Sequence, residues 1–183
     1  VNALALADLD GDGALDIVSD VEYPSATDYG VAVWQNDGTP FSGLWTWSVI
    51  GDSKDAVNAL AVGDLDNDGR VDVASGSGSG EDYEVIAWYS PASPFVDPWT
   101  QEDVGASADD VNGVALADLD HDGDLDIASA SGNGEDFELI VWENTHTPET
   151  LGAWTEVTQP APTYDALSVS VADLDHDGKL DIA

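Results

Sequence analysis

The sequence predicts an all-β protein in which small antiparallel sheets repeat along one domain, residues 1–183. Three observations lead to this prediction. One stretch recurs four times, short runs rich in β-branched and aromatic residues follow it, and no segment shows a sustained 3.6-residue period with helix caps. With 183 residues and 43% apolar content, the chain is long enough to bury a core. We therefore expect almost no helix.

The recurring stretch reads VNALALADLDGDGALDIVS at its first occurrence and VNGVALADLDHDGDLDIAS at its third. The first loop aspartates of successive copies are 56, 54 and 55 residues apart: Asp8, Asp64, Asp118 and Asp173. Such a period is typical of tandem supersecondary units. It divides the chain into three full repeats and a partial fourth, residues 1–56, 57–110, 111–165 and 166–183.

Each full repeat has room for four strands. In the first repeat, VNALALAD predicts strand one, LDIVS strand two and VAVW strand three, and strand four begins at Trp45. Tandem four-stranded antiparallel units are typical of β-propeller blades, which bury their faces against neighbouring blades. Strand one, with small residues such as Ala59 and Gly63, is expected to be innermost, with Leu60 and Val62 turned towards a flanking blade.

Tryptophans recur in step with the repeats. One set ends strand three and a second set begins strand four: Trp34, Trp88 and Trp142, and Trp45, Trp99 and Trp154. We expect these side chains to form the core between blades and not a platform for sugars or bases. Trp47 is an exception, because the other repeats lack a counterpart.

A D-x-D-x-D-G-x-x-D loop separates strands one and two of every repeat. We number these loops 1 to 4; they cover residues 8–16, 64–72, 118–126 and 173–181. Positions 1, 3, 5 and 9 are aspartate in all four: Asp8, Asp10, Asp12, Asp16, Asp64, Asp66, Asp68, Asp72, Asp118, Asp120, Asp122, Asp126, Asp173, Asp175, Asp177 and Asp181. Position 6 is always glycine, which permits a sharp turn.

Alternating carboxylates of this kind converge on one point and suit a hard cation. Calcium takes six to eight oxygen ligands, which the four side chains, water and the backbone carbonyl of position 7 would supply. Position 7 is Ala14, Arg70, Asp124 or Lys179. The alternative is a plain Asp-Gly turn, but a turn needs one aspartate, and four within nine residues repel one another without a cation. Magnesium suits the loop less because it demands octahedral geometry. We expect one Ca²⁺ per loop, up to four.

The loop between two short strands, in units of about 55 residues, resembles the FG-GAP or VCBS repeat. An EF-hand matches less well, because position 12 is Ser19, Ser75 or Ser129 instead of glutamate and the flanks are strands. The FG-GAP resemblance, to the heads of integrin α-subunits and to large secreted bacterial proteins, implies a β-propeller with calcium held by the sixteen aspartates. The F-G…G-A-P consensus is weak here, which places the chain nearer the VCBS-like branch.

The charge balance bears on partners and location. Asp and Glu number 38 against three Lys and Arg, a formal net charge of -35, so nucleic acid and anionic membranes are not expected partners. No apolar stretch is long enough for a membrane span, and there is no cysteine. An acidic surface suits salty or extracellular surroundings, and exposed calcium sites of extracellular modules bind at about 10⁻⁴ to 10⁻³ M. We expect an extracellular or cell-surface protein.

The expected function is a structural, adhesive or ligand-binding calcium module with a protein or carbohydrate ligand. Copies could assemble into a surface layer or filament, in which a second chain completes the partial fourth repeat. The absence of methionine, also at position 1, predicts that the chain is a piece of a longer one. The alternative class is part of a secreted polysaccharide-degrading enzyme.

An enzyme is not expected, because residues suited to catalysis are few. His121 and His176 occupy position 4 of loops 3 and 4 as solvent-facing fillers, and His146 lies in a turn. No nucleophile elbow, zinc-protease or phosphate-loop motif is present. A second acidic recurrence could be a solvated turn or an accessory cation rim: Glu81, Asp82, Glu135 and Asp136, with Asp28 alone in the first repeat.

Overall fold

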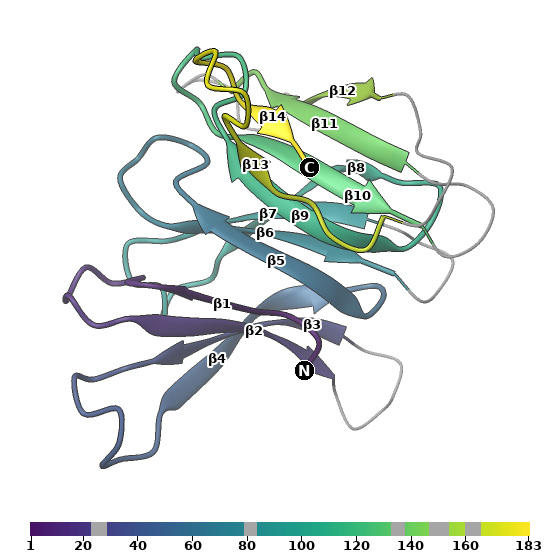
Figure 1. The fold of residues 1–183 in the computed structure, drawn as a ribbon. Coiled ribbons are helices and arrows are strands. Elements are labelled where there is room, and N and C mark those ends of the chain that lie inside the picture. The colour runs from purple at the N-terminus through teal and green to yellow at the C-terminus, as the bar shows by residue number, and fades with distance from the viewer. Residues whose placement is uncertain (23–28, 79–83, 133–137, 147–153, 160–165) are drawn as a thin grey trace.

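The computed structural model describes residues 1–22, 29–78, 84–132, 138–146, 154–159 and 166–183. These residues form fourteen strands and no helix, so the predicted all-β class is confirmed (Figure 1). No helix in the described part of the chain could therefore cross a membrane.

Three sheets of four strands and one hairpin make up the fold, and all strand pairs are antiparallel. The first sheet contains β1 (Leu4–Ala7), β2 (Asp16–Glu22), β3 (Tyr29–Gln35) and β4 (Thr46–Ser53). The second contains β5 (Val57–Gly63), β6 (Asp72–Ser77), β7 (Glu84–Tyr89) and β8 (Thr100–Ala106). The third contains β9 (Val111–Ala117), β10 (Asp126–Ser131), β11 (Glu138–Asn144) and β12 (Trp154–Thr158). The hairpin pairs β13 (Val171–Ala172) with β14 (Asp181–Ile182).

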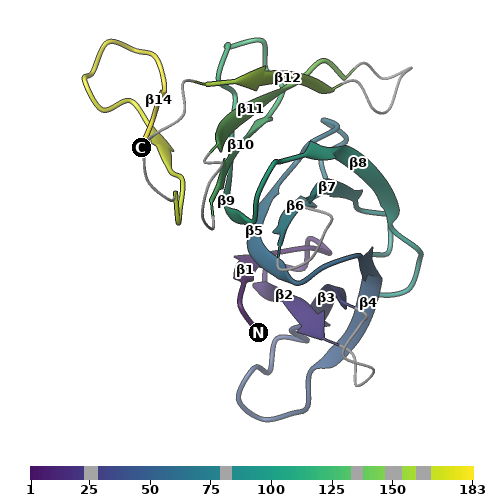
Figure 2. The ribbon, with the colours of Figure 1, turned by 90° about the vertical axis from the view of Figure 1, so that its right-hand side faces the viewer.

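In each sheet the strands lie side by side in chain order, so the predicted four strands per full repeat are confirmed. The three sheets and the hairpin are arranged one after another in chain order (Figure 2). The described strands form no closed barrel or ring. The number of blades and the repeat boundaries therefore stay predictions.

The first strand of each sheet contacts the first strand of the next sheet or hairpin. β1 contacts β5, β5 contacts β9, and β9 contacts β13. Leu60 and Val62 of β5 pack against the core shared with the first sheet, as predicted. A Cβ on Gly63 would lie 2.7 Å from Cδ1 of Leu125 in loop 3, so β5 and this loop approach each other closely.

Two hydrophobic cores lie between consecutive sheets. The first joins the first and second sheets and contains Leu9, Val18, Val31, Val33, Ile50, Val57, Val73, Ile86, Trp88 and Trp99. The second joins the second and third sheets and contains Leu65, Ala74, Val85, Ala87, Tyr89, Val104, Val111, Ile127, Ile140 and Trp142. The second sheet is covered on both faces, and every residue of β6 and β7 is buried. This explains why these strands consist almost entirely of small and apolar residues.

Trp88 and Trp142 are the largest buried side chains, at 0% and 2% exposure, and their predicted place between sheets is confirmed. Each indole N–H donates to a serine hydroxyl of the adjacent strand over 2.9 Å. Each ring also lies against a glycine of the preceding sheet's fourth strand. A Cβ would come within 2.1 Å of Trp88 at Gly51 and within 2.2 Å of Trp142 at Gly105. Glycine is therefore required under both rings.

Trp34 also donates its indole N–H to a serine, Ser19, but it departs from the pattern in its burial. It is half-buried and stacks on Trp47 with ring centroids 5.3 Å apart, because no described sheet covers this face of the first sheet. Trp45 and Trp99, which precede the fourth strands, donate their indole N–H to the carbonyls of Pro40 and Pro94. These two tryptophans thus fix the turn between strands three and four.

Candidate metal centres

The four loops join strand one to strand two of the three sheets and the hairpin, at the predicted place (Figure 1). In every case position 9 is the first residue of the second strand, and it pairs across the ladder with the residue just before position 1. The antiparallel register therefore brings positions 1 and 9 together at the mouth of each loop.

Two positions in each loop adopt a left-handed backbone. The glycines at position 6 have φ between 87° and 102°. Position 4 is also left-handed, with φ of 74° at Gly11, 58° at Asn67, 66° at His121 and 63° at His176. Both histidines are exposed, as predicted. The Gly and Asn at position 4 of loops 1 and 2 are the sequence signal for this conformation.

Backbone hydrogen bonds organise the carboxylates around the turn. In loops 1, 2 and 4, the N–H groups of positions 5 and 6 donate to the two oxygens of the position 1 aspartate over 2.9–3.1 Å. In all four loops, the N–H of position 7 donates to the carboxylate of position 5 over 2.7–2.9 Å. These bonds hold the side chains on the inside of the loop. The predicted role of the position 7 carbonyls of Ala14, Arg70, Asp124 and Lys179 stays a prediction.

Each loop gathers three carboxylates whose nearest oxygens lie within 4.8 Å of one another. The groups are Asp8, Asp10 and Asp16; Asp64, Asp66 and Asp72; Asp118, Asp120 and Asp122; and Asp173, Asp175 and Asp181. Twelve of the sixteen predicted ligands are thus brought together. The other four stand outside these groups: Asp12, Asp68, Asp126 and Asp177. Asp68 is held elsewhere by an ion pair with Arg70.

Position 9 has a second role that the sequence did not suggest. Its carboxylate accepts the N–H of position 2 over 2.8–2.9 Å in all four loops. In the three sheets it also accepts a backbone N–H at the end of strand three, from Asn36 and Ser90 just after β3 and β7 and from Asn144, the last residue of β11. Position 9 therefore ties the loop to a strand that is distant in sequence.

Burial of the position 9 aspartates alters their acidity. Asp16 and Asp72 are fully buried and Asp126 is nearly so. Burial raises the pKa of Asp72 to about 7, although two backbone N–H donors oppose this and nearby aspartates reinforce it. Burial raises the pKa of Asp16 and Asp126 in the same direction. These groups are costly to ionise unless a cation lies beside them.

Loop 3 offers a direct test of whether the residues fit a cation. One oxygen of Asp118, Oδ1, is buried and has no hydrogen-bond partner. This orphaned oxygen belongs to the group that Asp118 forms with Asp120 and Asp122. An unpartnered buried acceptor among other carboxylates is unfavourable by itself and favourable next to a hard cation. The donor set and this oxygen therefore fit a metal ion such as calcium.

The remaining candidates are His146 and the second acidic recurrence. The His146 ring packs against Tyr89, with centroids 6.2 Å apart, and the backbone N–H of His146 donates to Oδ1 of Asn144. The second acidic recurrence, with Glu81, Asp82, Glu135, Asp136 and Asp28, lies outside the described residues.

The loops match a known protein family. The family model described as FG-GAP-like repeat matches residues 8–75 and 118–183, which cover all four loops. The chain belongs to this family. The FG-GAP part of the predicted resemblance is thus confirmed, whereas the VCBS-like branch stays a prediction. No curated protein matched the chain.

Proposed function

We propose that this FG-GAP-like repeat chain is a calcium-binding, β-propeller-like module of an extracellular or cell-surface protein. The observation that carries the proposal is the convergence of three aspartates in each of four equivalent loops, with the orphaned Asp118 oxygen in loop 3. Carboxylate, carbonyl and water oxygens are the ligands that calcium prefers. The proposed ligands are the aspartates of positions 1, 3, 5 and 9, with the carbonyl of position 7.

Calcium in this position has a structural role. Positions 1 and 9 lie at the ends of two paired strands, and position 9 also holds the end of strand three. A cation between them neutralises carboxylates that otherwise repel one another, and so stabilises the hairpin of each sheet. Because the site is assembled only by folding, the binding free energy adds to the stability of the fold.

Location and partners follow from this role. Exposed calcium loops of moderate affinity fill at extracellular calcium concentrations and stay empty in the cytosol. The acidic surface disfavours nucleic acid and anionic membranes as partners and leaves a protein or carbohydrate ligand. We propose binding and not catalysis, since the acidic groups converge as ligand sets. A variant of this proposal is self-assembly, in which another copy of the chain completes the partial fourth repeat. Light scattering in calcium and in EDTA would test it, and a particle size that is the same in both would contradict it.

Thermal unfolding with calcium titrated against EDTA tests the central proposal. Each site should add about 1.4 kcal/mol when free calcium is about tenfold above its Kd. The variant Asp120→Asn removes a proposed ligand from loop 3 and should reduce the calcium-dependent rise in Tm. The control Asp97→Asn removes an exposed acid outside the loops and should leave the rise unchanged. An unchanged Tm in calcium, or an equal rise with magnesium, would contradict the proposal.

A further inference from the structure

Loops 1 and 2 are close structural copies. In both, the N–H of position 5 donates to Oδ1 of position 1 over 3.1 Å, and the N–H of position 6 donates to Oδ2 of position 1 over 2.9 Å. Both gather the carboxylates of positions 1, 3 and 9. They differ at three positions, of which only position 7 changes the charge: it is Ala14 in loop 1 and Arg70 in loop 2. Arg70 is therefore the one added charge when loop 2 is compared with loop 1.

Arg70 is held in place over its own loop. Its guanidinium forms an ion pair with the carboxylate of Asp68, which is position 5 of loop 2. Its Nε donates to the carbonyl of Ser90 over 2.8 Å. The N–H of Ser90 in turn donates to the buried Asp72 over 2.7 Å. The backbone group that anchors Arg70 is thus fixed by the aspartate at position 9 of the same loop.

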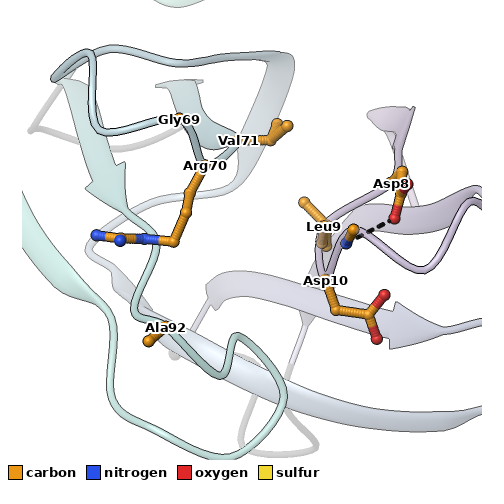
Figure 3. A pocket seen from close by; sticks show the side chains of 8 residues that line it. Asp8, Leu9, Asp10, Gly69, Arg70, Val71 and Ala92 are labelled. Atoms are coloured by element: carbon orange, nitrogen blue, oxygen red, sulfur yellow. Dashed lines mark hydrogen bonds between the residues drawn. The ribbon is translucent and has the colours of Figure 1, made fainter.

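The guanidinium of Arg70 is directed towards loop 2 and away from loop 1. Arg70 lines a cavity of about 170 Å³ between the two loops, together with Asp8 and Asp10 of loop 1. Figure 3 shows that its guanidinium points away from these two aspartates. In loop 2, by contrast, the guanidinium pairs with the carboxylate of Asp68, the position 5 aspartate. The guanidinium therefore lies within electrostatic reach of proposed calcium ligands.

We propose that Arg70 is a built-in counter-ion that makes loop 2 a weaker calcium site than loop 1. This inference rests on the proposed calcium-binding function. To use Asp68 as a ligand, calcium must displace the guanidinium or share the carboxylate with it, and the two cations repel each other. Calcium affinity in such loops is set by the count of ligand charges and by site rigidity. An anchored arginine reduces the net negative charge of loop 2, and so its affinity for calcium, without removing any aspartate.

Loop 4 supplies a matched control. Its position 7 is Lys179, whose backbone N–H donates to Asp177 as Arg70 does to Asp68. Among the residues that the structure describes, the Lys179 side chain makes no ion pair, whereas Arg70 has both its ion pair and its carbonyl anchor. A flexible, solvated ammonium is a weaker competitor than a fixed guanidinium. Lys179 should therefore affect loop 4 less than Arg70 affects loop 2.

The test is a calcium titration followed by amide NMR of the position 6 glycines, each of which reports on one loop. In the wild-type protein, Gly69 should reach half-saturation at a higher calcium concentration than Gly13. Arg70→Gln removes the charge and keeps a side-chain N–H for the Ser90 carbonyl. It should lower the Gly69 midpoint about two- to fivefold, the range of one exposed ion pair, and leave the Gly13 midpoint unchanged. Lys179→Gln should shift the Gly178 midpoint by less than about twofold.

The outcomes separate the inference from the function on which it rests. Equal midpoints for Gly13 and Gly69 in the wild type, or an unchanged Gly69 midpoint in Arg70→Gln, would overturn the role of Arg70 while calcium binding stands. A shift in Lys179→Gln as large as that in Arg70→Gln would overturn the claim that the anchored ion pair is what matters. No response at any glycine would overturn the proposed function and this inference with it. Far-ultraviolet circular dichroism in EDTA checks that each variant is folded.

Discussion

Raising the pH should destabilise the calcium-free protein, and Asp72 is expected to be the main cause. Burial raises the pKa of this carboxyl from 3.8 to about 7. The folded state therefore holds the proton more tightly than the unfolded state does, so protonation favours folding. The resulting stability is fully present below about pH 4 and is lost as the pH rises through about 7.

The size of the effect follows from the shift. A difference of about three pKa units corresponds to about 4 kcal/mol between the acidic and the alkaline limit. This is a large share of the 5–15 kcal/mol that is typical of a domain. Burial also raises the pKa of Asp16, Asp66 and Asp126, so these groups add to the effect in the same direction.

Calcium should reverse this dependence. A cation beside Asp72 favours the carboxylate over the protonated acid, so calcium binds best where the group is ionised. The stabilisation by calcium should therefore grow between about pH 5 and pH 8. Calcium binding near pH 7 should also release protons, which calorimetry in buffers of different ionisation enthalpy would detect.

The assay is urea unfolding between pH 5 and pH 8, in EDTA and in calcium. Wild-type protein in EDTA should lose stability as the pH rises. Asp72→Asn cannot titrate at this position, so its calcium-free stability should depend less on pH. The reasoning is refuted if the wild type in EDTA is as stable at pH 8 as at pH 5, or if the slope of Asp72→Asn equals that of the wild type.

Two further predictions concern the packing between sheets, and urea unfolding checks both. Gly51→Ala should lower the free energy of unfolding by about 1–3 kcal/mol, because the added Cβ would overlap the Trp88 ring. The control Gly43→Ala, whose Cβ would have its nearest neighbour at 3.8 Å, should change it by no more than about 0.5 kcal/mol. Equal effects of the two variants would contradict the packing. Ser129→Ala should cost about 1–3 kcal/mol, because it leaves the buried indole N–H of Trp142 without its acceptor; a neutral result would mean that water replaces the hydroxyl.

Much of the fold could be predicted because it repeats. Its local patterns are the loop, the strands on either side of it and the tryptophan at the end of strand three. The loop occurs four times in the sequence and the tryptophan three times, so each pattern can be recognised by its repetition. The antiparallel hairpin that these patterns imply is formed by residues close in sequence, so local preferences are sufficient to define it. The same holds for the position 6 glycine, whose left-handed backbone follows from its place in the turn.

The sequence by itself determined the class of fold, the four loops and the residue types that could hold a cation. Only the tertiary structure decided which residues at equivalent positions of the repeats share the same burial, pKa and hydrogen bonds. Trp34 and Trp88 occupy the same place in their repeats, yet one is half-exposed and the other buried, because a preceding sheet covers only Trp88. Asp72 gains its raised pKa from burial, and Arg70 its anchor from Ser90, twenty residues away. Burial and long-range hydrogen bonds depend on neighbouring sheets and strands, which a local pattern does not contain.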